Sequence, residues 1–242
     1  MKLGKATRDA FGEALRELGR ERPEIVVLDG DVSNSTRTEY FAKEFPERFF
    51  QVGIAESNLI GVASGLAGAG KLPVVASFAC FIMCNAFDQL RMSVAFPKLN
   101  VKVVGSHAGI SIGEDGPSQM GIEDLALACA LPGFSVIVPA DEVETRAATR
   151  AMIEHRGPVY LRTGRPKVPL VYENGCDFKI GVAIQLRDGK DLTLIANGIM
   201  VAQALEAAEA LAQEGIQARV LDIATLKPID REAIVKAARE TG

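Results

Sequence analysis

The sequence predicts an α/β fold in which helices flank a parallel sheet, followed by a partial second α/β domain. Apolar runs of about five to seven residues, the length of buried strands, alternate with longer segments of helical period. Glycine and proline, which favour turns, separate these segments. The 242 residues include 23 glycines and 11 prolines. This alternation is typical of β-α-β units, whose strands run parallel and are covered on both faces.

The first unit holds five strand candidates and five helix candidates. The strand candidates are short apolar runs at residues 24–28, 72–77, 101–105, 135–138 and 159–162. The helix candidates are longer segments of helical period at residues 7–18, 56–69, 85–95, 122–130 and 142–155. Asp141 is expected to cap the last of these helices, with Glu144 completing a capping box.

The periodicity fails in a polar stretch that predicts a domain boundary. We expect one domain over residues 1–165, a linker over 166–190 and a second unit over 191–242. The second unit shows strands and helices at residues 192–196, 200–213 and 218–222, and again from Asp230. About fifty residues are too few to cover a sheet on both faces, so this unit is expected to be part of a domain.

Charge and hydropathy exclude two classes of partner. The 31 acidic and 27 basic residues give a net charge of −4. They form no basic run, so nucleic-acid binding is not expected. The apolar stretch 59–87 is broken by Gly68, Lys71 and Pro73, which favours a buried helix, a turn and a strand over a membrane span.

The N-terminus and the cysteines predict a cytoplasmic protein. The first residues contain Asp9 and Glu13 and lack the apolar run of a secretory signal. The cysteines lack the spacing of a zinc site, and we expect reduced core thiols and no bound metal at Cys80, Cys84, Cys129 and Cys176.

Polar clusters follow the ends of the predicted strands, at residues 28–38, 50–58, 106–124 and 161–166. Ligands of open α/β sheets bind outside the carboxyl ends of the strands, so these clusters predict a small-molecule site. Each has a simpler reading as well. Glu56, for example, is an acidic residue in the first turn of a helix, where the helix dipole favours negative charge.

The clusters carry the motifs ATR, GDVSNS, FQVGIAESN, SFACFI, SHAGISIGEDGPSQMGIEDL and YLRTGRP, in this order. The set resembles the pyrimidine-binding domain of transketolases, and LDIATLKPID resembles the start of their C-terminal domain. The resemblance implies a thiamine diphosphate enzyme. It would transfer a two-carbon ketol unit from a ketose phosphate to an aldose phosphate in the pentose phosphate network.

The resemblance implies cofactor-binding roles for four residues. Glu56 matches the catalytic acid that hydrogen-bonds the ring nitrogen of the aminopyrimidine, and Phe81 matches the aromatic residue that stacks on that ring. Phe78 lies beside it in the sequence and is expected either to join the stack or to belong to the core. Asp31 resembles the acid at the subunit interface near the cofactor.

Substrate-binding roles are implied in the same way. His107 and Asp115 match residues that bind the hydroxyls of the donor, and His107 also assists proton transfer. Gln119 stands where many microbial transketolases carry a histidine, and an amide binds a hydroxyl but does not titrate.

A phosphate pocket is implied by three further matches. Arg8, Ser33 and Arg162 correspond to the residues that hold the phosphate of the sugar, a task that suits the planar fork of arginine. Arg165 would take the place of Arg162 if the alignment shifted by three residues.

One family motif is missing. Thiamine enzymes hold Mg²⁺ and the diphosphate with a GDG segment, but no glycine follows Gly30 and Asp31. We therefore expect Mg²⁺ on an N-terminal transketolase subunit and this chain to be the separate C-terminal subunit of a split transketolase. A homodimer or heterotetramer is expected. The small residues of 60–70 and 85–95 fit either its interface or a tight core.

Two other functions remain open from the sequence. FPERFFQVGIAESN and GLAGAGKLPVVASF also resemble deoxyxylulose-phosphate synthase, and the β subunits of 2-oxoacid dehydrogenases share the fold. Both of these begin with decarboxylation of a 2-oxoacid, whereas ATR and SHAGISIGEDGPSQ favour transketolase. The third possibility is a regulatory or assembly subunit that keeps the fold without turnover.

Overall fold

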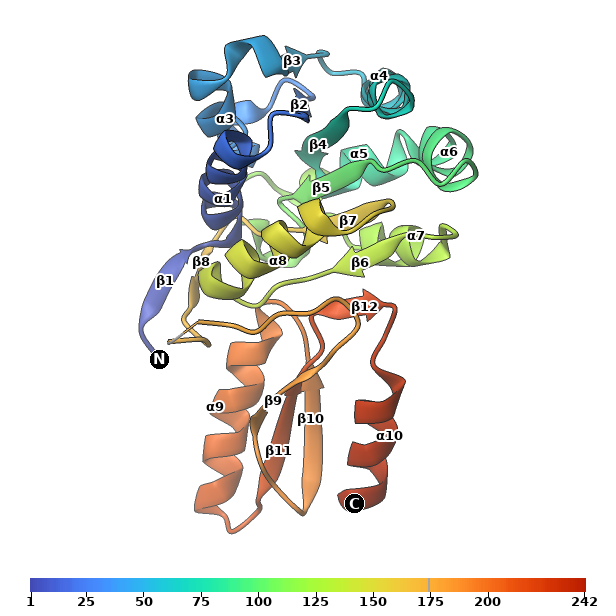
Figure 1. The fold of residues 1–242 in the computed structure, drawn as a ribbon. Coiled ribbons are helices and arrows are strands. Elements are labelled where there is room, and N and C mark those ends of the chain that lie inside the picture. Colours follow the sequence, from blue (N-terminus) through green and yellow to red (C-terminus); the bar gives the residue numbers. More distant parts are fainter. Residues whose placement is uncertain (174) are drawn as a thin grey trace.

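The computed structural model describes residues 1–173 and 175–242, which form a large and a small α/β part stacked end to end (Figure 1). The large part is built on a seven-stranded sheet in the order β12-β6-β7-β5-β4-β2-β3. Its strands are β2 (Ile25–Asp29), β3 (Phe49–Gln51), β4 (Leu72–Phe78), β5 (Lys102–Ser106), β6 (Ser135–Ile137), β7 (Val159–Arg162) and β12 (Thr225–Lys227). All neighbours pair in parallel except β12 and β6, so the predicted fold class is confirmed.

Helices cover both faces of this sheet. One face carries α1 (Thr7–Glu21), α3 (Glu39–Glu44) and α8 (Glu142–Glu154) over a core that includes Phe11 and Phe41. The other face carries α4 (Glu56–Gly68), α5 (Ala79–Cys84), α6 (Phe87–Gln89), the π-helix η2 (Leu90–Ala95) and α7 (Asp124–Ala130). The large part also contains the short helices α2 (Ser33–Thr36), η1 (Pro46–Arg48), η3 (Ile110–Ile112) and η4 (Pro117–Gln119).

Two helix predictions need correction. The helix expected over 85–95 is split into α6 and η2, and α5 is an additional helix that the sequence pattern did not separate from the preceding strand. Asp141 caps α8 as expected, accepting from the amides of Val143 and Glu144. The Glu144 carboxylate, however, accepts from the amide of Ala140 at 2.7 Å, one residue before the predicted capping-box partner.

The small part is a three-stranded sheet in the order β10-β11-β9. Its elements are β9 (Ile184–Arg187), β10 (Leu192–Ala196), α9 (Met200–Gln213), β11 (Ala218–Asp222) and α10 (Arg231–Glu240). The chain then returns to the large sheet through β12, a strand that the sequence did not predict. Two short strands also lie in the stretch predicted to be irregular, because β8 (Lys167–Pro169) pairs with β1 (Leu3–Ala6) and β9 joins the small sheet.

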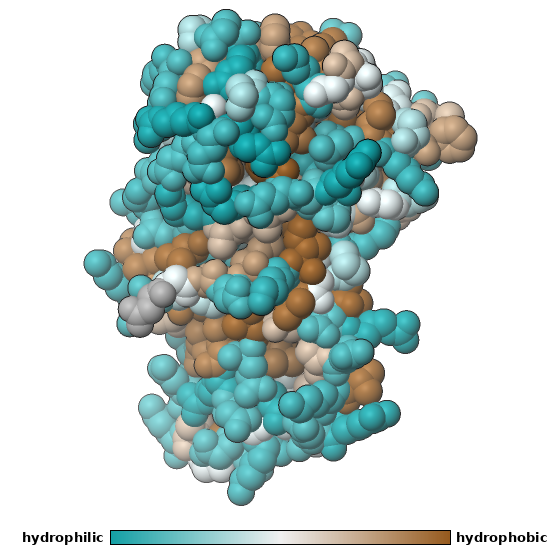
Figure 2. Space-filling view, in the orientation of Figure 1, coloured by the Kyte–Doolittle hydropathy of each residue, from teal (hydrophilic) through white to brown (hydrophobic). Residues whose placement is uncertain are grey.

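Surface hydropathy follows this division. Figure 2 shows polar residues over both ends of the molecule and apolar residues gathered across the middle, where the two parts meet. No helix in the described part of the chain is long and apolar enough to cross a membrane.

Candidate active site

The carboxyl edge of the large sheet collects several of the predicted site residues. Ser33 follows β2, Phe81 follows β4, His107 follows β5, and Arg162 ends β7. Arg8 joins them from the start of α1, because the preceding Thr7 accepts a hydrogen bond from the amide of Gly164 just beyond β7.

His107 is held from three sides. Its Nε2 lies 3.1 Å from Arg8 Nη1, its Nδ1 lies 2.9 Å from Ser106 Oγ, and its ring stacks on Phe78 with 4.0 Å between centroids. The residue has a φ of +57°, in the left-handed region, where histidine is tolerated at functional sites. Burial, assisted by the charge of Arg8, lowers the pKa of His107 to about 4. The ring is therefore neutral at physiological pH.

The two phenylalanines differ in what they offer a ligand. Phe78 is 8% exposed and its ring also lies parallel to that of Phe81, with 5.6 Å between centroids. Phe81 is only half-buried. Phe78 thus supports His107 within the core, whereas Phe81 keeps open surface for stacking.

Glu56 begins α4 and is 6% exposed. Asn85, just beyond α5, donates from Nδ2 to its Oε2 at 3.2 Å. Among the described residues no hydrogen-bond donor reaches Glu56 Oε1, so this oxygen is free for a ligand. Helix α5 therefore links the two predicted cofactor residues, carrying Phe81 within it and orienting Glu56 through Asn85.

The first polar cluster is organised by Asp29, a residue without an assigned role in the sequence motifs. Its buried carboxylate accepts from the amide of Val32 and from the hydroxyls of Thr36 and Thr38, each at 2.7 Å. Burial raises its pKa, although these hydrogen bonds oppose the shift. The fixed turn presents Asp31 on the surface and Ser33 at the start of α2.

The glycine-rich loop over residues 107–123 is held by contacts from two directions. Arg165 donates to the carbonyl of Ile112 at 3.0 Å and pairs with Glu114 and with Asp115. Cys80 in α5 donates to the carbonyl of Gln119 at 3.3 Å, while the Gln119 side chain accepts from Ser118. Asp115 and Gln119 thus lie on the same loop, and Arg165 is used to hold that loop.

Arg162 is bound to a residue that the sequence did not single out. It donates to both carboxylate oxygens of Asp124 and to the carbonyl of Gly121, and Tyr160 donates to the same carboxylate. The only sequence signal was that Tyr160 and Arg162, two residues apart in a strand, share a face of the sheet.

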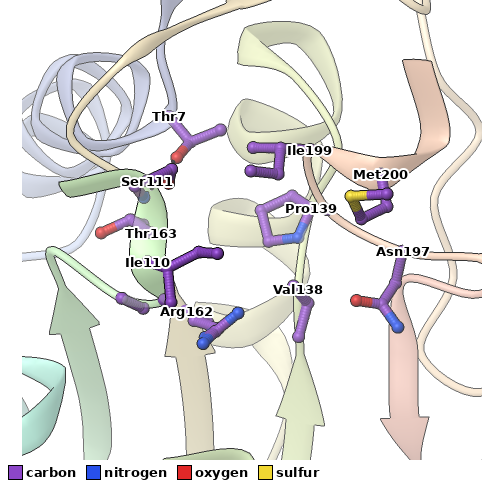
Figure 3. A pocket seen from close by; sticks show the side chains of 14 residues that line it. Thr7, Ile110, Ser111, Val138, Pro139, Arg162, Thr163, Asn197, Ile199 and Met200 are labelled. Carbon is purple, nitrogen blue, oxygen red and sulfur yellow. Dashed lines mark hydrogen bonds between the residues drawn. The ribbon is translucent and has the colours of Figure 1, made fainter. Parts of the chain in front are cut away.

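A cavity of about 220 Å³ lies beside Arg162, between the two parts of the molecule (Figure 3). Thr7 and the 108–111 loop form one wall, and Ile199 and Met200 of the small part form another. Arg162 is the charged residue of the lining. The arrangement suits a small polar ligand whose negative group meets the guanidinium.

The fit to an aminopyrimidine cofactor rests on Glu56 and Phe81. A buried carboxyl with one open oxygen can hydrogen-bond a ring nitrogen, and a half-exposed aromatic ring can stack on a heterocycle. A metal has no comparable site, since no group of three or more His, Cys, Asp or Glu side chains in the described ranges is arranged to hold one.

Two family models match the sequence. The model of the transketolase pyrimidine binding domain covers residues 4–171, and that of the transketolase C-terminal domain covers residues 181–242.

Similar proteins include both separate sections and single-chain enzymes. A transketolase C-terminal section of Methanocaldococcus jannaschii is 48% identical over 235 residues, which are 96% of this chain and 74% of that protein. Transketolase of Homo sapiens is 44% identical over 239 residues, 98% of this chain but only 38% of the human protein. A solved structure described as a split gene transketolase, inactive β4 tetramer, is 54% identical, with a TM-score of 0.91, and the match covers 99% of this chain and 78% of that one.

Proposed function

Because the chain belongs to the transketolase family, we propose that it is the C-terminal subunit of a split transketolase, transferring a two-carbon ketol unit from a ketose phosphate to an aldose phosphate. It corresponds over its length to the C-terminal section of the split enzymes. The observation that carries the proposal is Glu56. Its buried carboxyl has one oxygen held by Asn85 and one open, and Asn85 directly follows the helix that carries the half-exposed ring of Phe81.

In this proposal Glu56 and Phe81 hold the aminopyrimidine of thiamine diphosphate. Glu56 Oε1 would share a proton with the ring nitrogen, and Phe81 would pack on the ring face. When bound, thiamine diphosphate supplies the electron sink that breaking and forming carbon–carbon bonds next to a carbonyl requires. Asp31, exposed beside the start of α2, would face the cofactor from the subunit interface.

The substrate would lie on the side of His107 and Arg8. His107, Asp115 and Gln119 would bind donor hydroxyls. Nε2 of neutral His107 can accept a hydrogen bond from a substrate hydroxyl that replaces Arg8 there. Arg8, Ser33 and Arg162 would hold the phosphate. Arg8 Nε supports this role, since it is buried and has no partner among the described residues.

A partner completes the site in this proposal. An N-terminal transketolase subunit would hold Mg²⁺ and the diphosphate. The assembly would be a homodimer or a heterotetramer in the cytoplasm. Reduced cysteines agree with that compartment, because Cys80, Cys84, Cys129 and Cys176 are all free thiols.

The test is turnover by the complex reconstituted from this chain, the N-terminal subunit, thiamine diphosphate and Mg²⁺. Glu56→Gln and Glu56→Ala are expected to abolish ketol transfer, and the matched change Glu47→Gln at an exposed position to leave it intact. Near-normal activity of either Glu56 variant would refute the mechanism. Release of CO₂ from a 2-oxoacid without ketol transfer would instead indicate a decarboxylating relative of the family.

A further inference from the structure

Asp124 is a buried carboxylate that nothing in the proposed chemistry yet uses. It begins α7 and its side chain is 0% exposed. Tyr160 donates from Oη to Asp124 Oδ2 at 2.7 Å. Arg162 donates from Nε to the same oxygen at 2.9 Å and from Nη2 to Oδ1 at 3.1 Å. A buried charge with this set of donors is compensated and rigidly oriented.

These bonds decide which edge of Arg162 is available. Nη2 also donates to the carbonyl of Gly121 at 3.0 Å, so Nε and Nη2 are both committed to the protein. No acceptor among residues 1–173 and 175–242 takes a proton from Nη1. The guanidinium therefore presents one nitrogen, with two protons, to the cavity in Figure 3.

Two glycines make this arrangement possible by allowing close packing. A Cβ on Gly105 would overlap the hydroxyl of Tyr160 and lie 2.8 Å from its Cε2. A Cβ on Gly121 would lie 3.0 Å from the Cβ of Ala79 and 3.1 Å from the amide of Cys80. Close packing against the backbone at Gly105 and Gly121 therefore fixes both the tyrosine that orients Asp124 and the carbonyl that holds Arg162.

We propose that Asp124 is a positioning residue that fixes Arg162 so that Nη1 alone meets the phosphate of the sugar substrate, an inference that rests on the function proposed above. A free arginine side chain loses rotamer entropy when it binds a ligand. Because Asp124 already immobilises Arg162 in the folded protein, this entropy is lost on folding and not on substrate binding. Asp124 also limits the phosphate to an end-on contact in place of the usual bidentate fork.

The experiment compares kcat/KM of the reconstituted complex for a ketose phosphate with that for the same ketose without phosphate. Arg162→Ala is expected to lower this ratio by about 10- to 100-fold, the value of one charge-assisted hydrogen bond. Asp124→Asn is expected to lower it by about 10-fold through a higher KM for the phosphorylated substrate. In the Arg162→Ala background, Asp124→Asn should lower the ratio no further, because the residue it positions is gone.

Tyr160→Phe keeps the test decisive if Asp124→Asn fails to fold. It removes one bond to Asp124 without changing the packing and should lower the same ratio by about two- to fivefold. The matched control is Tyr172→Phe, which removes a buried tyrosine–aspartate bond of 2.8 Å to Asp222 and should leave the ratio unchanged.

The outcomes separate the two proposals. The positioning role alone is overturned if Asp124→Asn and Tyr160→Phe both keep the wild-type ratio. It is also overturned if Asp124→Asn lowers the ratio by the same factor in the Arg162→Ala background as in the wild type. A wild-type complex that turns over neither ketose contradicts the proposed function itself.

Discussion

Arg8 Nη1 lies 3.1 Å from His107 Nε2. Because a guanidinium only donates, Nε2 must be the accepting nitrogen of a neutral imidazole, and the ring proton belongs on Nδ1, where Ser106 Oγ accepts it at 2.9 Å. The same arginine also donates to the carbonyl of Ser35 at 3.1 Å. Arg8 thus couples the region that would bind phosphate to the tautomer of the histidine.

We predict that His107 stays neutral down to about pH 5. Burial and the charges of Arg8, Arg165 and Arg37 lower its pKa from 6.5 to about 4, so the folded state excludes the proton. The neutral ring therefore contributes stability that is fully present above pH 6.5 and is lost as the pH falls through the folded pKa. At about 1.4 kcal/mol per pKa unit, this contribution is at most about 3.5 kcal/mol.

Proton NMR measures this titration directly, because the chain contains two histidines. His155→Gln leaves His107 as the only imidazole. Its Cε1 proton should keep one chemical shift from pH 8 to about 5. A midpoint above pH 6 would contradict both the buried environment and the assigned tautomer.

The two stacked phenylalanines should separate cofactor binding from stability. Phe81→Ala removes the half-exposed ring and should weaken thiamine diphosphate binding by about 10-fold or more, since aromatic stacking adds about 0.5–1.5 kcal/mol to the loss of buried area. Phe78→Ala should lower the free energy of unfolding by about 3–5 kcal/mol, as for a large aromatic core residue.

Cofactor titration of the complex and urea unfolding of the isolated chain measure the two effects. Phe81→Leu serves as the control, because it keeps much of the apolar volume but not the ring. Equal loss of cofactor affinity in the Phe78 and Phe81 variants, at equal stability, would show that both rings contact the ligand.

Local sequence signals found the strands and helices that carry the site but not the contacts between them. The acidic first turn and apolar run of 56–69 located α4 to within one residue, and β7 was located without error. By contrast, α5 was missed because a short apolar run does not distinguish a buried helix from a strand by periodicity. Strand β12 is only three residues long and exists through its pairing with β6.

The same difference between local signals and long-range contacts explains which site residues could be predicted. Glu56, Phe81 and His107 were found from ordered motifs that are contiguous in the sequence. The bond between Asp124 and Arg162 joins residues 38 positions apart, and Tyr160, which also donates to Asp124, comes from the same strand as Arg162. No local pattern encodes such a pairing, because it depends on which strand becomes the neighbour of β5.

An acidic pair joins the two parts of the molecule. Glu144 of α8 and Asp222 of β11 are 0% and 1% exposed, and each has a carboxylate oxygen without a donor among the described residues. The hydroxyl of Tyr172 donates to Asp222, and the other charged neighbour is the carboxylate of Asp141. Burial raises the pKa of both Glu144 and Asp222, assisted at Glu144 by the charge of Asp222 and at Asp222 by the charge of Asp141, so a proton bound between them satisfies both oxygens.

We predict that raising the pH destabilises this contact. Both folded pKa values lie above the unfolded ones, so the stability contributed by the bound proton is present at low pH and is lost as the pH rises through the folded values. The melting temperature of the isolated chain should therefore fall between about pH 6 and 9. Glu144→Gln, which hydrogen-bonds without a proton, should flatten that profile, and the exposed Glu154→Gln should not. Parallel profiles for all three proteins would exclude the shared proton.

The outer face of α4, the helix that begins with Glu56, carries three glycines. Gly61, Gly65 and Gly68 are exposed, and a Cβ on any of them would meet no atom within 4 Å. Ile60 and Ala63 are buried on the opposite face, so the small residues of this helix serve the core and also leave a flat surface. In the proposed complex such a surface allows a partner backbone to approach closely.

Two substitutions of Gly65 should therefore differ in effect, one raising the stability of the chain and the other weakening its association with the partner. Gly65→Ala should stabilise the isolated chain by about 0.5–1 kcal/mol, because alanine has the higher helix propensity and the space is open. Gly65→Leu should fold equally well but weaken association with the N-terminal subunit by more than about 10-fold, the cost of about 1.4 kcal/mol for overpacking a close contact. Sedimentation velocity measures the association, and Ala210→Leu on the exposed face of α9 is the control. Unchanged association of Gly65→Leu would place the subunit interface on another face of the molecule.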